Sequence, residues 1–99
     1  PENTPEAIRG AARELLRIIA DENLLEPERM ISIILSLTPD LNATFPAEAA
    51  RELGWVHVPL FCTTEIPVPG ALQMCVRVLV HAYMDCAQDE VKHIYLSLS

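Results

Sequence analysis

MCVRVLVHAY (residues 74–83) is the clearest strand-like run of the chain, and the sheet that it predicts organises the rest. Side chains alternate between the two faces of a strand, so the valines share one face. The other face carries Cys75, Arg77, Leu79 and His81. A guanidinium in such surroundings needs an anionic partner, because an unpaired buried charge is very costly. Arg77 therefore indicates either a salt bridge across a subunit interface or a ligand site.

The stretch FCTTEIPVPG (residues 61–70) leads into this strand and contains an acid in a rigid setting. Pro67 and Pro69 hold the residues before them in extended conformations. Glu65 is thus expected on a stiff segment at the end of a strand predicted over residues 55–61. Such a segment suits a group that must keep one geometry. An ordinary exposed loop acid is the simpler interpretation of the same residue.

The remaining elements predict an α+β domain. Thr4, Pro5 and Glu6 form a typical helix start, with a capping hydroxyl, a proline at the first position and an acid in the first turn. Apolar residues then recur at helical spacing. A second helix is predicted at 46–53, and strands at 30–37, 55–61, 74–83 and 92–98. The order α-β-α-β-β-β predicts a mixed sheet with its helices on one face.

Composition limits the classes of function. The 99 residues fit a single domain, and a hydrophobic fraction of 51% is high for that length, so part of the apolar surface is expected to face another subunit. A net charge of −7 without a basic patch argues against nucleic acid as a partner. The sequence has no signal peptide and no membrane-length apolar segment, which predicts a cytoplasmic protein that does not enter the membrane.

Cysteines and histidines do not form a recognisable metal or nucleophile motif. The three cysteines lack CxxC spacing, and the three histidines lack metal-ligand spacing, so neither a disulfide framework nor a metal site is predicted. Taken singly, Cys62 is more typical of a packing residue than of a nucleophile. Arg51 is typical of a solvated helix position, and Tyr95 of a strand tyrosine that packs.

Four segments together resemble one family, the trimeric α/β-barrel class of monofunctional chorismate mutase. They are TPDLNATFPAEAARELG (38–54), VPLFCTTEIPVPGAL (58–72), CVRVLV (75–80) and QDEVKHIYL (88–96). The resemblance implies a homotrimer whose subunits form a pseudo-α/β barrel, with active sites between neighbouring subunits. It also implies conversion of chorismate to prephenate, a step of phenylalanine and tyrosine biosynthesis that needs no cofactor.

The resemblance further implies roles for matched positions. Arg77 matches the arginine that contacts the ether oxygen of chorismate, and Glu65 matches the glutamate that accepts a hydrogen bond from the ring hydroxyl. Tyr95 matches a tyrosine that binds a substrate carboxylate. The other matched positions contact or line the pocket: Cys62, Phe45, Ala47, Leu60, Phe61 and Arg51.

Two family segments have no counterpart in these 99 residues, namely a first strand that carries a carboxylate-binding arginine and a C-terminal tail. Arg9 in AIRGAA mimics the arginine motif but aligns with the first helix. We expect the missing pieces to complete the pocket in a longer protein. Two alternatives stay open: a trimer of this fold that binds a small anion without catalysis, for which Arg77 would matter and Glu65 would not, and an inactive truncated fragment.

Overall fold

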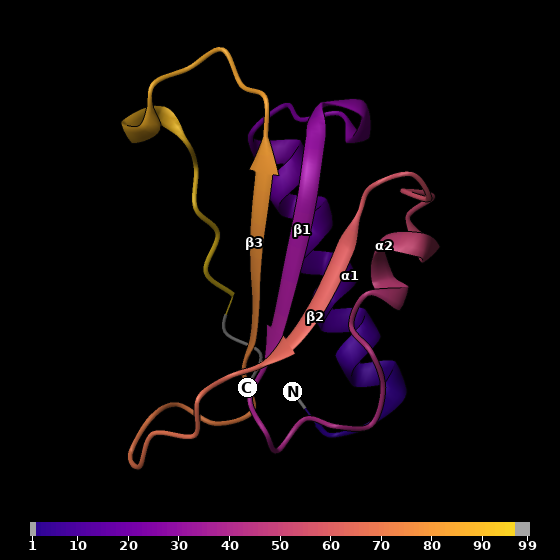
Figure 1. Cartoon of the computed structure of the whole chain (residues 1–99), viewed down its shortest axis with the longest axis vertical. Helices are drawn as coiled ribbons and strands as arrows, with labels where there is room; N and C mark the ends of the chain where they lie inside the picture. Colours follow the sequence, from indigo (N-terminus) through magenta and orange to yellow (C-terminus); the bar gives the residue numbers. More distant parts are fainter. Residues whose placement is uncertain (1, 97–99) are drawn as a thin grey trace.

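The computed structural model describes residues 2–96, and it contains one mixed sheet with its helices on one face (Figure 1). The elements are α1 (Pro5–Glu22), β1 (Met30–Leu37), α2 (Glu48–Glu52), β2 (Leu60–Thr64) and β3 (Val76–Ala82), with 3-10 turns at Pro27–Arg29 and Gln88–Glu90. The three strands lie in the order β2-β1-β3. Strand β2 runs parallel to β1 and β3 runs antiparallel to it, which confirms the predicted α+β class and mixed sheet.

Helix α1 begins where the sequence predicts. The Thr4 hydroxyl accepts a hydrogen bond from the backbone N–H of Ala7 at 3.1 Å, and Pro5 occupies the first turn. Ile8, Ala12 and Leu16 recur along one side of the helix and are fully buried against the sheet.

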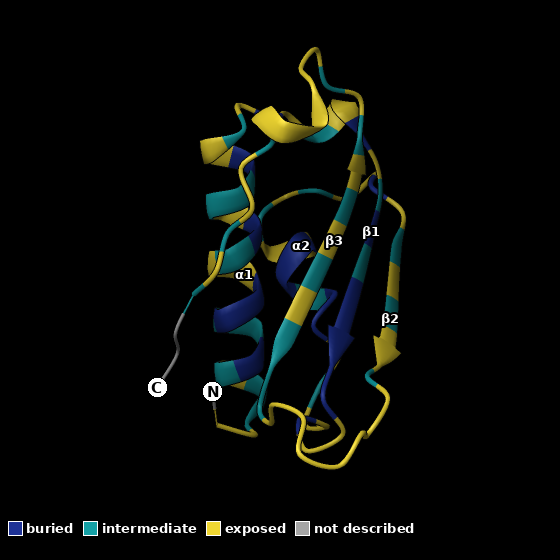
Figure 2. Ribbon diagram, turned by 90° about the vertical axis from the view of Figure 1, so that its left-hand side faces the viewer, coloured by how far each residue is buried: buried dark blue, intermediate teal, exposed yellow. Residues whose placement is uncertain are grey.

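The core lies between the helices and strand β1. Ile33 and Leu35 of this central strand are fully buried on the helix side, together with Ala49 and Ala50 of α2 (Figure 2). Strand β3 shows the predicted alternation, with Arg77, Leu79 and His81 exposed on the face away from the helices. We call that exposed side of the sheet, which also carries Ser36 and Phe61, the open face.

The strand predicted over residues 55–61 is wrong at its beginning. Residues 55–59 form turns, and β2 starts at Leu60 and continues to Thr64. Gly54, at a φ of 83°, redirects the chain after α2. Pro59 has no N–H for a ladder hydrogen bond, but its carbonyl accepts one from Ile33 at 3.0 Å and so begins the pairing with β1.

The last predicted strand, over residues 92–98, is not formed in its described part, residues 92–96; positions 97 and 98 lie outside the described residues. Asn23 at the end of α1 explains this. Its side chain accepts a hydrogen bond from the N–H of Lys92 at 2.8 Å and donates one to the Lys92 carbonyl at 2.9 Å. Both backbone groups of Lys92 are thereby committed to the helix end, so the segment runs beside the sheet instead of joining it.

Ion pairs connect the two helices. Arg9 lies 3.1 Å from a carboxylate oxygen of Glu52 and 3.4 Å from one of Glu48, and Arg13 pairs with Glu52 as well. Arg9 thus lies on the first helix, as its alignment predicted, and it pairs there with carboxylates of α2. Within residues 2–96, no helix combines the length and the apolar character needed to cross a membrane.

Candidate active site

The register of the sheet gathers polar side chains at one end of the open face. Ser36 on β1 stands opposite Thr63 on β2 and opposite Arg77 on β3. Glu65 follows β2 directly, two residues beyond Thr63, so the strand alternation places it on the same face. Three segments that are distant in the sequence therefore meet around one carboxylate.

The Glu65 carboxylate is held through both of its oxygens. Arg77 Nε lies 3.1 Å from Oε1, and the Ser36 hydroxyl donates a hydrogen bond to Oε2. The backbone N–H of Glu65 also donates to the carbonyl of Leu37 at 2.8 Å, which extends the β1–β2 pairing by one residue. The side chain is 25% exposed, so Glu65 is a half-buried, fixed acid rather than an ordinary loop acid.

Arg77 has an anionic partner within its own chain, namely Glu65. Neither of the two partners considered from the sequence, a bound ligand or an acid of another subunit, is therefore needed to neutralise its charge. Its side chain is 69% exposed, and its Nε faces Glu65. Among the described residues, Glu65 is the partner that the structure gives to this guanidinium. The two terminal amino groups therefore remain available for an anion on the open face.

Two hollows meet at Arg77. One, of about 550 Å³, lies beside Glu65 and is lined by Thr38, Asp40, Leu72 and Cys75 as well. The other, of about 920 Å³, runs along β3 between α1 and the segment 91–96, and Tyr95 lines it together with Arg77. The structure thus brings three predicted site residues, Glu65, Arg77 and Tyr95, around one continuous stretch of surface.

Asp40 is committed to structure, although it lines the smaller hollow. Both of its carboxylate oxygens accept the backbone N–H of Met74 at 3.1 Å, and Thr38 donates its hydroxyl to the same side chain. Met74 has a φ of 54°, an unusual value for a residue other than glycine. Asp40 therefore anchors the strained start of β3 and fixes the position from which Arg77 projects.

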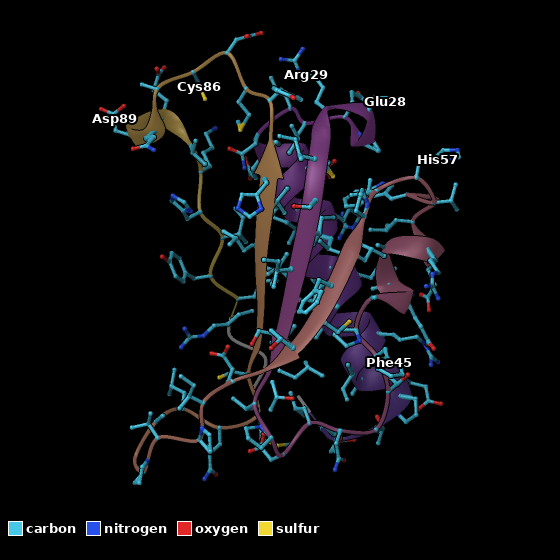
Figure 3. The ribbon with its side chains drawn as sticks, viewed as in Figure 1. Glu28, Arg29, Phe45, His57, Cys86 and Asp89 are labelled. Atoms are coloured by element: carbon cyan, nitrogen blue, oxygen red, sulfur yellow. The ribbon has the colours of Figure 1, made fainter. Side chains whose placement is uncertain are left out.

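The other predicted residues lie apart from this group. Leu60 and Cys62 alternate onto the helix side of β2 and pack against the core, while Phe61 is exposed on the open face. Ala47 is buried in the core. Phe45, in the loop before α2, is exposed (Figure 3), and Arg51 is exposed on α2 itself.

Neither hollow that Arg77 lines includes Phe45, Ala47 or Arg51 among its described lining residues. On one copy of the chain, the matched positions therefore fall into two groups, one around Glu65 and Arg77 and one around α2. Ser36 is the contact that the sequence reasoning missed. The available signal was a serine in the apolar run MISIILSL, at a position where that strand should be buried.

Among residues 2–96, no cluster of three or more histidine, cysteine, aspartate or glutamate side chains is placed to hold a metal ion. A fixed carboxylate beside an outward-facing guanidinium can accept a hydrogen bond from a ligand hydroxyl while it presents a positive charge to a ligand oxygen.

Comparison with known proteins gives three consistent matches. A sequence model of one family, described as chorismate mutase type I, matches residues 1–99. The chorismate mutase AroH of Bacillus subtilis (strain 168) is 44% identical over 95 residues, which are 95% of this chain and 75% of that protein. The chorismate mutase AroH of Thermus thermophilus is 46% identical over 96 residues, which are 96% of this chain and 79% of that protein.

A solved structure agrees with these sequence matches. The chorismate mutase from Clostridium thermocellum superposes with a TM-score of 0.94 at 44% identity, over 96% of this chain and 85% of that one. The arrangement of α1, α2 and the three-stranded sheet is therefore shared with that enzyme over nearly the whole length of this chain.

Proposed function

Because this chain belongs to the chorismate mutase type I family and is a chorismate mutase, we propose that Arg77 and Glu65 form the catalytic pair of its active site. The family match confirms the resemblance that four sequence segments predicted. It also confirms an isomerase of aromatic amino acid biosynthesis, and we expect it to act in the cytoplasm on that account. The observation that carries the catalytic assignment is the Glu65–Arg77 ion pair on the open face, 3.1 Å between Oε1 and Nε.

The reaction limits what the protein has to supply. Rearrangement of chorismate to prephenate is pericyclic, so bonds break and form within one molecule without a nucleophile. Two contributions remain. One is selection of the compact, reactive conformer by positioning. The other is stabilisation of the charge that separates as the ether bond breaks, when the ether oxygen becomes negative and the ring becomes relatively positive.

The geometry of Arg77 suits contact with the ether oxygen of chorismate. Its Nε is engaged by Glu65, which fixes the guanidinium plane and leaves the terminal amino groups to donate to the ether oxygen. A fixed cation gains interaction energy as the oxygen becomes negative, so it stabilises the transition state more than the ground state.

Glu65 has the complementary role at the ring. Its carboxylate is held from two directions, by Ser36 and by Arg77, and still has lone pairs that can accept a hydrogen bond from the ring hydroxyl. Its negative charge lies close to the ring that becomes relatively positive. Tyr95, which lines the larger hollow together with Arg77, is available to donate to a substrate carboxylate.

We propose further that the active site is completed by a second copy of the chain in a homotrimer. Two features support this. The open face exposes large apolar side chains, among them Phe61 and Leu79, which a neighbouring subunit can cover. The matched residues also fall into two separate groups on one subunit, so a site that uses both groups needs two copies.

The proposed homotrimer predicts the mass of the protein in solution. Sedimentation equilibrium of this chain should give a mass of about three times 11.0 kDa at micromolar concentration. The variant Leu79→Asp, which places a charge on the open face, should shift the distribution toward monomer. Leu24→Asp is the matched control, because Leu24 is equally apolar and is exposed in the turn after α1. A wild-type chain that stays monomeric would remove the trimer and the shared site together.

Subunit complementation tests the shared site directly. Arg77→Gln and Arg51→Ala chains, unfolded together and refolded as a mixture, should regain more chorismate mutase activity than either chain alone. Some sites in the mixed trimers combine an intact Arg77 from one copy with an intact Arg51 from the other.

The control for this experiment is a mixture of Arg77→Gln with Glu65→Gln. These two residues contact each other within one subunit, so no mixed site contains both intact residues. The control mixture should therefore stay inactive. Equal recovery in both mixtures, or recovery in neither, would refute the division of the site between two copies.

A further inference from the structure

Ser36 is a polar side chain near the C-terminal end of the most buried strand, β1, and its hydroxyl contacts the proposed catalytic acid. We propose that Ser36 is a positioning residue for the rearrangement: it holds the Glu65 carboxylate in the orientation that receives the ring hydroxyl. This inference rests on the catalytic role proposed above for Glu65. Ser36 itself is not expected to touch the substrate, because its side chain lies beneath the carboxylate that it binds.

The surroundings of Ser36 indicate that its hydroxyl serves Glu65. The residue is only 8% exposed, although its side chain lies on the open face, opposite Thr63 and Arg77. A buried hydroxyl needs a hydrogen-bond partner, and the one that the structure gives it is Oε2 of Glu65. Thr38, the other buried polar residue of the described chain, binds Asp40 and the backbone of Cys75 instead, and so belongs to the start of β3.

Ser36 is a better anchor for the carboxylate than Arg77. The Arg77 side chain is 69% exposed, so solvent weakens the restraint that its ion pair places on the Glu65 carboxylate. Its guanidinium must also serve the substrate. Ser36 has a single side-chain torsion that moves its oxygen, and it lies on the central strand, which pairs with β2 on one side and β3 on the other. The hydroxyl therefore fixes Glu65 to the rigid part of the fold when Arg77 turns its charge toward the ether oxygen.

The negative charge of Glu65 favours a hydrogen bond from the Ser36 hydroxyl. An ionised carboxylate only accepts hydrogen bonds, and the hydroxyl has one proton to donate. Ser36 therefore uses one acceptor position on Oε2 and leaves the others open toward the surface. A hydrogen bond to a charged group typically contributes about twice as much as a neutral one. Its loss should let the carboxylate rotate, so that the ring hydroxyl meets it in the productive orientation less often.

The test compares Ser36→Ala with Ser36→Thr in the full chain, with chorismate as substrate and trimer formation checked first. We expect Ser36→Ala to lower kcat roughly 10- to 100-fold, the range for loss of a hydrogen bond to a charged group, while KM changes only slightly. Ser36→Thr keeps the hydroxyl and should restore most of kcat. Ser32→Ala is the matched control: Ser32 lies on the same strand and hydrogen-bonds His81 at 3.1 Å, away from Glu65.

A double-mutant cycle separates positioning from general stability. In a Glu65→Ala background, Ser36→Ala should change kcat by less than about twofold, because nothing remains to be positioned. The inference would be overturned if Ser36→Ala lowered kcat by the same factor in the Glu65→Ala background as in the wild type. A normal kcat in the single variant Ser36→Ala would also overturn it. If Glu65→Ala turned over chorismate normally, the catalytic role of Glu65 and this inference would both fall. If only Ser36→Ala were normal, this inference alone would be refuted.

Discussion

Arg77→Gln is expected to lower kcat on chorismate by on the order of 10²–10³, with a much smaller effect on KM. In the role proposed for Arg77, the guanidinium contacts the ether oxygen, whose negative charge appears only as the ether bond breaks. Loss of the guanidinium should therefore destabilise the transition state more than the bound substrate. Glutamine suits this experiment because its amide can still donate to Oε1 of Glu65, now 3.1 Å from Arg77 Nε. The fold around the pair should therefore survive.

Arg77→Lys should restore only part of the lost rate. Arg77 uses Nε for Glu65 and keeps its terminal amino groups for the substrate, whereas lysine has one nitrogen for both tasks. The measurement is kcat and KM for both variants, after sedimentation has shown that each assembles like the wild type. Near-normal turnover in an assembled Arg77→Gln chain would contradict the catalytic role of Arg77 and would show that its ion pair with Glu65 is only structural.

Glu65→Gln is expected to have the second-largest effect, a loss of kcat on the order of 10². The amide keeps the shape of the side chain: its single carbonyl oxygen can accept from Arg77 Nε, and its NH2 group can donate to the Ser36 hydroxyl. It has no charge to place beside the developing positive ring. KM should stay unchanged or fall. Chorismate is a dianion, and removing a fixed negative charge from its site should not weaken binding.

This pattern distinguishes catalysis from mere binding. A trimer that only bound small anions would need Arg77 and would be indifferent to Glu65. A Glu65→Gln chain with wild-type kcat, measured by the loss of chorismate absorbance and the formation of prephenate, would contradict the catalytic role. Glu65→Asp is a useful comparison: it keeps the charge but is one methylene shorter, so it should reach Ser36 and Arg77 less well together.

Sequence patterns alone were enough to predict the local elements and the family. The cap at Thr4 and the spacing of apolar residues specify α1, and the apolar run MISIILSL specifies β1 with the bounds Met30–Leu37. The alternation in residues 74–83 placed Arg77 on a face with Leu79 and His81, and the structure bears this out. Such features depend on neighbours within a few residues, so a sequence pattern can reveal them.

Two strand predictions failed because distant contacts decided them. Residues 55–61 have strand-forming composition, but the chain pairs with β1 only from Leu60 onward. The pairing begins where the Pro59 carbonyl accepts a hydrogen bond from the N–H of Ile33. Residues 92–96 end in Ile94, Tyr95 and Leu96, which favour a strand, but Asn23, directly after α1, takes both backbone groups of Lys92. The composition of a segment indicates its preferred secondary structure. It does not indicate which distant groups will form hydrogen bonds with the backbone of that segment.

The construction of the site depends on contacts between segments that are far apart in the sequence. The sequence supplied Glu65 and Arg77 as separate candidates, and the resemblance supplied their roles. Their contact, and the hydroxyl beneath them, follow from the order β2-β1-β3 and from the register that sets Ser36 opposite Thr63 and Arg77. A shift of one residue would turn each side chain of a strand to the other face. That register is fixed by hydrogen bonds and core packing between segments far apart in the chain, which is why the sequence alone did not reveal Ser36.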